Sequence, residues 1–480
     1  NGFRAYQRIK IFLMIYAVKS ICGKKTRVIV EHSVDKNHYC EIENIDINND
    51  FLLNLESKMR ETIKKDFEIQ RKYLTRETAL NITKEFGEDV DRFKFNRNSN
   101  ISFYKLDWYY DYYYAPLLPG LKYIKDFYLH KRLNGFMIQF PCFNKPYEFK
   151  DIQSKEKISS VFMESSHWLK IMKLETVNSL NKVICAGKTH ELINLSETLH
   201  ENKIVNIAQA IQKKLRQIVL IGGPTSSGKT TFANRLRVHL KANGLRPYVV
   251  SLDDYFLDRD KVPIDENGKK DFECLEALDV DRLNCDLKEL LDHKTVEIPK
   301  FNFITGKSER SNRYIKLTKG DILILEGIHG LNEKATKDIE REKKFKIFIS
   351  AMTQLNLDDH NRISTTDTRL VRRIVRDSQY RGFRAKDTIN MWHSVVRGEN
   401  NYIFPYQEEA DMFFNSALVY ELSVLKQFAE PLLFDISDLD SEYCEANRLT
   451  RFLNSFLGID TRFIPRNSIL REFIGGSCFY

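Results

Sequence analysis

The sequence predicts an α/β fold in which a parallel sheet is covered by helices on both faces, preceded by an α+β domain. Strand patterns alternate with helical patterns from about residue 212 onward, which is typical of such a sheet. Residues 1–155 instead carry short, mixed helical and strand signals. We therefore expect three parts: an α+β domain at 1–155, a helical bridge at 156–211 and an α/β domain at 212–480.

The composition is that of a folded protein rather than a disordered or disulfide-built one. The 480 residues can form two or three hydrophobic cores, and 42% of them are hydrophobic while 29% are charged. A net charge of +9 suits polyanionic substrates but is too thinly spread to indicate nucleic acid binding. The eight cysteines lack the spacing of a disulfide framework, so we expect reduced thiols and a cytoplasmic protein with no membrane partner.

The first domain has the periodicity of packed helices. The apolar run at 11–18 is too short to span a membrane and has no signal-peptide cleavage site, so we expect a packed helix there. A short strand is expected at 27–30, and apolar residues recur at helical spacing over 52–63. Another helix is expected from Thr75 to a stop at Gly87.

Two patterns in the first domain have a functional and a structural interpretation. The aromatic run at 104–114 could stack on single-stranded bases, but few basic residues interleave it, which favours a packed strand and turn. His32, His38 and Cys40 match no common zinc spacing, and a buried structural role is favoured over a metal site.

Residues 218–231 read Ile-Val-Leu-Ile-Gly-Gly-Pro-Thr-Ser-Ser-Gly-Lys-Thr-Thr and predict a site for nucleotide phosphates. Four apolar residues have the character of a buried parallel strand, and G-x-x-x-x-G-K-[ST] follows without a mismatch. Glycines let backbone N–H groups converge on phosphate oxygens at the start of the next helix. The expected nucleotide-binding residues are Gly223, Pro224, Thr225, Ser226, Ser227, Gly228, Lys229, Thr230 and Thr231.

The helix after this loop and the later strands complete the predicted sheet. Apolar residues recur at helical spacing after Thr231, and Gly244 marks the stop. Lys229 is expected to reach the outer phosphates, and the Thr230 hydroxyl is expected to bind Mg²⁺. Further strands are expected at 247–252, 322–325, 346–350 and 411–416.

Carboxylates follow two of these strands, at the sheet edge where the phosphate loop lies. Asp253 and Asp254 end one strand, and we choose Asp253 as the base that accepts the proton of an attacking hydroxyl. Strand-end capping is the alternative for this pair. Glu326 directly follows four buried-strand residues and is expected to hold Mg²⁺ with Thr230.

A basic helix is predicted between residues 362 and 386. Four arginines lie on one helical face, opposite Leu370 and Ile374, and Arg381-Gly382 adds a hinge-like break after them. Arginines on a closing lid neutralise the charge of a transferring phosphoryl group and exclude water. A solvated basic face is the alternative. The four arginines are Arg369, Arg372, Arg373 and Arg376.

Six motifs over about residues 212–420 resemble, in their order and separation, the uridine kinase and phosphoribulokinase family of P-loop kinases. They are Gly223-Pro-Thr-Ser-Ser-Gly-Lys-Thr-Thr, Asp253-Asp-Tyr-Phe, Asp271-Phe-Glu, Pro299-Lys-Phe-Asn-Phe, Glu326-Gly-Ile-His-Gly and Asp367-Thr-Arg-Leu-Val-Arg-Arg-Ile-Val-Arg-Asp. The resemblance implies a P-loop kinase fold, ATP (or GTP) as phosphate donor and Mg²⁺ as cofactor.

Carried over residue by residue, the resemblance implies two sets of site residues. The catalytic set is Asp253, Lys229, Arg369 and Arg373. The substrate-binding set is Asp253, Tyr255, Phe272, Glu273, Phe301, Phe303, Arg372 and Arg376.

Three positions depart from the pattern of pyrimidine kinases in this family. Glu273 stands where Asp is usual, Phe256 where Tyr is usual, and Gly306 where a histidine commonly contacts the uracil ring. Polar contacts to a base discriminate far more strongly than apolar shape does, so the preferred nucleoside does not follow from the resemblance alone.

The first domain resembles the second additional domain of threonyl-tRNA synthetases. The likeness is carried by Glu31-His32-Ser33, Tyr39-Cys40-Glu41 and the later segment from Gly135-Phe136 to Phe140-Pro141. The His-x-x-x-His pair of the editing pocket is lacking, so we expect a structural or an RNA-contacting role rather than hydrolytic editing. The whole chain resembles large nucleoside kinases in which such a region precedes the kinase.

The expected function is ATP-dependent phosphorylation of a ribonucleoside 5′-hydroxyl, with uridine or cytidine as the first choice and UMP or CMP as product. Another nucleoside or small hydroxyl substrate stays open as the alternative within enzymes. A nucleotide-dependent RNA-binding or regulatory protein is the alternative outside them. We also expect a homo-oligomer.

Overall fold

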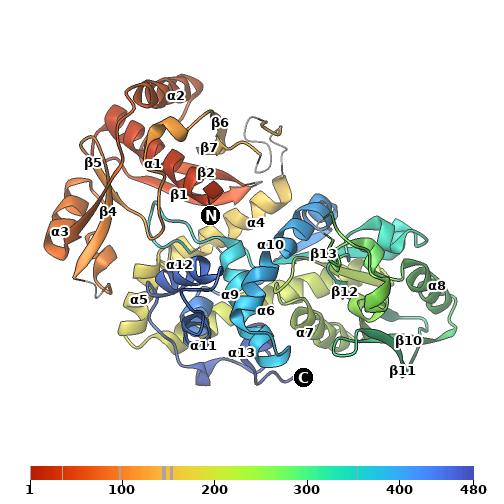
Figure 1. Cartoon of the computed structure of the whole chain (residues 1–480). Helices are drawn as coiled ribbons and strands as arrows, with labels where there is room; N and C mark the ends of the chain where they lie inside the picture. Colours follow the sequence, from red (N-terminus) through yellow and green to blue (C-terminus); the bar gives the residue numbers. More distant parts are fainter. Residues whose placement is uncertain are drawn as a thin grey trace. The chain divides into compact units, whose positions relative to one another are not determined.

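The computed structural model describes residues 2–34, 36–96, 99–142, 148–151, 155–266, 268–353 and 355–479. Two units, each discontinuous in sequence, make up the chain (Figure 1). The first consists of Asn1–Lys188, Gln354–Ser364 and Asn447–Leu457, and the second of Thr189–Thr353, Thr365–Ala446 and Gly458–Tyr480. The segment expected as a bridge, residues 156–211, is thus divided between the two units.

The first unit is built on a four-stranded antiparallel sheet with the order β1-β2-β7-β6. Two helices lie beside this sheet (Figure 1) and close one hydrophobic core with it. The apolar run at 11–18 lies in the first of these helices and is buried throughout, so the prediction of a packed helix is confirmed. The elements are α1 (Gly2–Cys22), β1 (Val28–Val34), β2 (Asn37–Ile42), α2 (Asn49–Lys64), β6 (Tyr128–Arg132) and β7 (Gly135–Gln139).

A smaller antiparallel sheet, β3-β4-β5, completes the first unit together with three helices. The Thr75 side chain caps the helix that follows it by accepting from the Thr78 amide, and Gly87 has φ +72° just beyond its end, as predicted. Tyr109 and Tyr113 of the aromatic run are buried, which confirms the packed strand. The elements are β3 (Gln70–Thr75), α3 (Arg76–Glu85), β4 (Asn100–Leu106), β5 (Tyr109–Tyr112), α4 (Glu156–Met172) and α5 (Val177–Cys185).

The second unit contains a five-stranded sheet with the order β14-β13-β8-β12-β9, in which every neighbouring pair is parallel. Every residue of β8, β12 and β13 is buried, as expected for strands covered on both faces. The predicted parallel sheet is therefore confirmed. The strands are β8 (Ile218–Gly222), β9 (Arg246–Ser251), β12 (Asp321–Gly327), β13 (Lys344–Ser350) and β14 (Met412–Asn415).

Helices and one hairpin surround this sheet. The hairpin of β10 and β11 was not predicted from the sequence, because its second strand is a largely exposed polar run without alternation. No helix in the described part of the chain is both long enough and apolar enough to cross a membrane. The elements are α6 (Thr189–Lys214), α7 (Lys229–Ala242), α8 (Val280–Leu291), β10 (Thr295–Asn302), β11 (Lys307–Lys316), α9 (Thr365–Tyr380), α10 (Ala385–Tyr402), α11 (Glu421–Phe434) and α13 (Arg471–Ile474). The remaining helix, α12 (Tyr443–Leu453), begins in the second unit, and its residues from Asn447 onward belong to the first unit.

Candidate active site

The phosphate loop, residues 223–228, joins the end of β8 to the start of α7. A Cβ atom on Gly223 would lie 2.0 Å from the carbonyl oxygen of Ile349, so only glycine lets the loop pass β13 this closely. Gly228 has φ +83° and directly precedes the first residue of α7, a conformation that glycine adopts without strain. The two glycines of the motif therefore set the path of the loop. They also place the N-terminus of α7 at the loop, where its amides can bind an anion.

Lys229 folds back over this loop. Its Nζ donates hydrogen bonds of 3.1 Å to the carbonyl oxygens of both Gly223 and Pro224. Burial lowers the pKa of Lys229, and the charges of Glu326 and Asp253 oppose that shift. The amine is thus held over the loop within the field of two carboxylates, where a phosphate would meet it.

Thr230 and Glu326 form a pair of oxygen ligands beside the loop. The Thr230 hydroxyl donates a 3.3 Å hydrogen bond to Glu326 Oε1. Burial, and next the charge of Asp253, raise the pKa of Glu326 to about 7. A dehydrated carboxylate next to a hydroxyl and a second carboxylate is a donor set that fits a hard divalent cation such as Mg²⁺, so these residues could hold the predicted metal.

Asp253 and Asp254 are neighbouring residues of the short 3₁₀ turn that follows β9, Leu252–Tyr255. Asp254 accepts a hydrogen bond from the backbone of Phe301 in the hairpin, and burial raises the pKa of Asp254. The charge of Asp253 instead acts on Lys229 and Glu326. Of the two carboxylates, Asp253 is therefore the one whose charge acts on Lys229 and Glu326, and its role as the base stays a prediction.

Tyr255 corrects one expectation. It lies in the hydrophobic core of the unit, and its hydroxyl donates a 3.0 Å hydrogen bond to Asp286. The tight turn after β9 sends successive side chains to different sides, so Leu252 and Tyr255 are buried while Asp253 stays accessible. The Tyr255 side chain is thus buried in the core, with its hydroxyl engaged by Asp286.

Glu273 lies against α10 with one oxygen unsatisfied. A Cβ atom on Gly398 would lie 2.3 Å from Glu273 Cβ, which shows how closely helix and side chain approach. Glu273 Oε2 is buried and has no hydrogen-bond partner among the described residues. Burial raises the pKa of Glu273 to about 7, while Arg373 opposes the shift and Glu399 adds to it. Such an oxygen is placed to accept a hydrogen bond from a ligand hydroxyl.

Aromatic side chains continue from Glu273 toward the hairpin turn. Ring centroids of Phe272 and Phe256 lie 6.5 Å apart, those of Phe256 and Phe301 5.6 Å, and those of Phe301 and Phe303 5.1 Å. Phe301 is buried, whereas Phe303 is 53% exposed. The guanidinium of Arg381 lies 5.6 Å from the Phe303 ring. The predicted residues Phe272, Phe301 and Phe303 are thus linked through Phe256 into one continuous row of rings.

The predicted lid arginines divide into two groups, and the first group corrects the expectation of an exposed lid. Arg369 and Arg372 are fully buried in α9. Arg369 forms a bidentate pair with Glu399 and donates to the Thr225 carbonyl at 3.2 Å. Arg372 pairs with Glu421 and donates to the Ser226 carbonyl at 3.3 Å. These two guanidinium groups therefore stabilise the phosphate loop through its backbone carbonyl oxygens.

The second group carries uncompensated positive charge. Arg373 and Arg376 donate to opposite oxygens of Asp377 at 3.0 Å and 3.0–3.1 Å, and Arg381 lies 3.8 Å from the same carboxylate. Burial, and next the charges of Arg376 and Arg373, lower the pKa of Arg381 to about 10. Three guanidinium groups share the one carboxylate of Asp377, and charge interactions also link Arg381 with Asp253 and Arg373 with Glu273. The predominance of positive charge suits an anionic ligand.

Sequence reasoning missed the carboxylates that complete the site. Glu399 accepts from the Thr225 amide at 3.2 Å as well as from Arg369. Glu421 binds Arg372, and Glu472 binds Thr231. Their partners are 30 to 241 residues away in the chain, so no local spacing could have identified them. His329, in the motif after β12, packs near the backbone of Glu273, and burial lowers its pKa to about 4.

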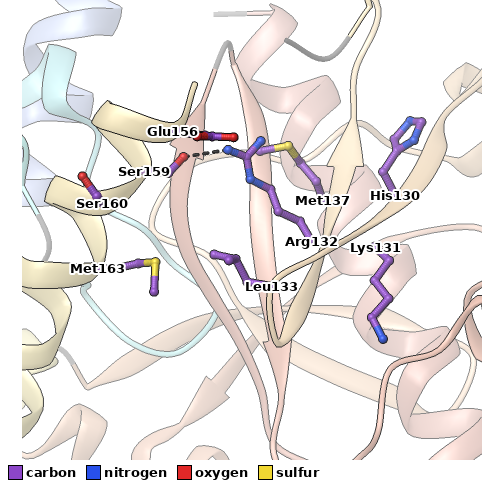
Figure 2. A pocket seen from close by; sticks show the side chains of 9 residues that line it. All are labelled: His130, Lys131, Arg132, Leu133, Met137, Glu156, Ser159, Ser160 and Met163. Carbon is purple, nitrogen blue, oxygen red and sulfur yellow. Dashed lines mark hydrogen bonds between the residues drawn. The ribbon is translucent and has the colours of Figure 1, made fainter. Parts of the chain in front are cut away.

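The first unit holds two features apart from these residues. Figure 2 shows a pocket in which Arg132 donates a hydrogen bond to Ser159 Oγ, at 2.7 Å, and which Met137 and Met163 also line. Elsewhere Glu88, Asp111 and His360 lie close enough to share a cation. Arg92 pairs with both carboxylates of that group, Glu88 and Asp111. The protein's own arginine therefore already offsets their negative charge. Neither feature contains a residue predicted for the site.

Comparison with known proteins finds a likeness over part of the second unit. The sequence model of the phosphoribulokinase / uridine kinase family matches residues 218–423. The uridine kinase of Lactobacillus johnsonii is 30% identical over 203 residues, which are 42% of this chain and 87% of that protein. The uridine kinase of Lactobacillus helveticus is 31% identical over 202 residues, with the same two shares.

A solved structure gives a weaker likeness. A possible uridine kinase from Bacillus stearothermophilus is 22% identical and is matched over 31% of this chain and 79% of that chain, with a TM-score of 0.26.

Proposed function

Because the chain belongs to the phosphoribulokinase/uridine kinase family, we propose that it transfers the γ-phosphoryl group of ATP to the 5′-hydroxyl of a ribonucleoside, with uridine or cytidine as the first choice. The relatives at about 30% identity are uridine kinases, which supports this class of acceptor. The observation that carries the proposal is the phosphate loop, over which Lys229 is hydrogen-bonded and beside which Thr230 donates to Glu326. The charge of Asp253 acts on both Lys229 and Glu326.

In the proposed reaction the acceptor hydroxyl lies between Asp253 and the donor. The Asp253 carboxylate accepts the hydroxyl proton while the hydroxyl oxygen bonds to the γ-phosphorus, and the bond from phosphorus to the β–γ bridging oxygen breaks to release ADP. Lys229 stabilises the charge on the outer phosphates. When the phosphates are bound, they take the place of the carbonyl oxygens of Gly223 and Pro224 as its partners.

Thr230 and Glu326 would hold Mg²⁺, whose chemistry is to offset the charge of the donor phosphates. These two residues fit the ion because both present oxygen donors at one point beside the loop. The excess charge of Arg373, Arg376 and Arg381 would stabilise the phosphoryl group from the side of α9.

The acceptor would contact Glu273 and the aromatic surface. The unsatisfied Glu273 Oε2 can accept from a ribose hydroxyl, and Phe301 and Phe303 offer faces on which a base can stack. Gly306 has no side chain that could hydrogen-bond the edge of the base, so other groups would have to make that contact. A kinase for another nucleoside or small hydroxyl compound is the alternative within this mechanism.

The test is turnover of a nucleoside panel by the full-length protein with ATP and Mg²⁺. We expect at least one ribonucleoside to be converted to its 5′-monophosphate, and Asp253→Asn to lower kcat by about 10²–10⁴-fold without weakening ATP binding. Asp254→Asn is the matched control, because its carboxylate is engaged by the hairpin backbone, and we expect a much smaller effect.

Two results would contradict the proposal. Full turnover by Asp253→Asn would refute the assignment of Asp253 as the base. Stimulation of ATP hydrolysis by tRNA, with no nucleoside converted, would favour a nucleotide-dependent RNA-binding protein. The expected homo-oligomer, an RNA contact through the first unit and a cytoplasmic location remain predictions.

A further inference from the structure

The segment at residues 458–479, here the C-terminal segment, places a carboxylate at the start of the phosphate-loop helix. Glu472, in α13, accepts hydrogen bonds through Oε2 from the Thr231 amide at 3.3 Å and from the Thr231 hydroxyl at 2.8 Å. Thr231 is the third residue of α7. The family match ends at residue 423, so the matched kinase region does not account for this contact.

The donors that Glu472 engages are those expected to bind nucleotide phosphate. The first amides of a helix have no partner within the helix and attract anions. After a glycine-rich loop, such amides hold the α- and β-phosphates of a nucleotide. The charge of Glu472 also acts on Lys229 and on Glu326. The carboxylate therefore shares the electrostatic environment of the predicted phosphate and metal ligands.

The C-terminal segment is also packed against the loop by apolar contacts. The Ile469 side chain lies so close to Gly228 that a Cβ atom there would be 2.5 Å from Ile469 Cγ2. The Phe473 ring centroid lies 5.0 Å from the guanidinium of Arg372, which in turn donates to the Ser226 carbonyl. The contact of Glu472 is therefore one of several by which the segment meets the phosphate loop.

The backbone of the segment is fixed independently of the Glu472 side chain. Arg471 donates to the carbonyl oxygens of Thr461 and Ile464 at 2.9 and 2.7 Å. Ile469, Leu470 and Phe473 are completely buried. The side chain of Glu472 can consequently turn away from Thr231 while the segment itself stays in place.

We propose that the Glu472 carboxylate is an internal competitor of nucleotide phosphate, which must leave the Thr231 amide and hydroxyl before a nucleotide can bind there. This proposal rests on the proposed function, since it requires a nucleotide at the phosphate loop. It identifies the C-terminal segment as an autoinhibitory element that lowers the affinity of the protein for its phosphate donor and keeps the helix start capped when no nucleotide is present.

The test is the Kd of Mg·ATP, measured by calorimetry without acceptor, for the full-length protein and for Glu472→Gln. The variant keeps an oxygen that can accept from Thr231 but removes the negative charge, so we expect ATP to bind about tenfold more tightly. Glu342→Gln is the control, because Glu342 is an exposed glutamate of the same unit and its loss changes the net charge equally. We expect its Kd to match that of the unchanged protein.

A second variant, Glu472→Asp, keeps the charge but shortens the side chain. We expect its affinity for ATP to lie between that of the unchanged protein and that of Glu472→Gln. Unchanged or weaker binding by a folded Glu472→Gln would overturn the proposal and indicate that the carboxylate only caps α7 or assists binding. If Glu472→Gln leaves Kd unchanged while nucleosides are still phosphorylated, the proposed function stands and the autoinhibition alone is refuted. If no protein binds ATP, both are refuted.

Discussion

Replacing Glu273 with glutamine should change how the stability of the second unit depends on pH. Burial raises the pKa of Glu273 to about 7 from an ordinary value of 4.5. Because the folded state holds this proton more tightly than the unfolded state, its contribution is greatest below pH 4.5 and is lost as the pH rises through 7. In the unchanged protein, stability should therefore fall across this window relative to Glu273→Gln.

The size of the effect follows from the two pKa values. A pKa difference of one unit corresponds to about 1.4 kcal/mol, and integration between pH 5 and pH 8 gives a relative loss of about 2.5 kcal/mol in the free energy of unfolding. The carboxylate oxygen responsible has no partner among the described residues, so in the nucleotide-free protein no ligand contact compensates for its ionisation.

The assay is urea denaturation of both proteins at several pH values, with hydrogen–deuterium exchange of β8 and β12 reporting on the unit that contains Glu273. Glu276→Gln is the matched control, since Glu276 lies in the same loop but is exposed; its curve should run parallel to that of the unchanged protein. Parallel curves for Glu273→Gln as well, differing by less than about 0.5 kcal/mol across the range, would refute the assignment of a dehydrated carboxylate.

Two further predictions concern the support of the phosphate loop. Gly223→Ala places a Cβ atom 2.0 Å from the Ile349 carbonyl, so we expect a loss of about 3 kcal/mol in unfolding free energy and loss of ATP binding, by denaturation and calorimetry; a variant that binds ATP normally would contradict this close approach. Glu421→Leu leaves the buried Arg372 unpaired and should destabilise the protein by about 3–5 kcal/mol, whereas addition of Arg372→Met should restore most of that loss. A double variant no more stable than Glu421→Leu would show that the pair is needed for more than mutual neutralisation.

The parallel sheet and the phosphate loop could be predicted because both depend on short, contiguous patterns. The run from Ile218 to Ile221 is apolar on both faces, and the glycines at 223 and 228 stand at a fixed spacing. The same is true of Glu326, which directly follows a buried strand. Local periodicity and local spacing are enough for features of this kind.

The environment of the arginines could not be predicted in the same way. Arg369 and Arg372 have the spacing of an exposed basic face, but each is neutralised by a carboxylate from a different helix, Glu399 or Glu421. Tyr255 was assigned to the substrate site by resemblance, yet a tight turn directs it into the core. Pairing across the chain and the sense of a turn are set by tertiary packing, which no window of sequence contains.

The path of the chain has a practical consequence. After β13 the polypeptide leaves the parallel sheet, and residues 355–364 complete the first unit, where His360 Nδ1 hydrogen-bonds Asp111 at 2.8 Å and Arg27 Nε hydrogen-bonds Asp359 at 2.7 Å. The chain then returns as α9, which carries the arginines. A fragment beginning at residue 189 would release these ten residues from their partners just before that helix. A fragment ending at residue 188 would lose His360 and Asp359, which pair with its Asp111 and Arg27. Truncation at this boundary would therefore remove stabilising contacts from both units. Substitutions in the full-length chain are the better way to test the function of either unit.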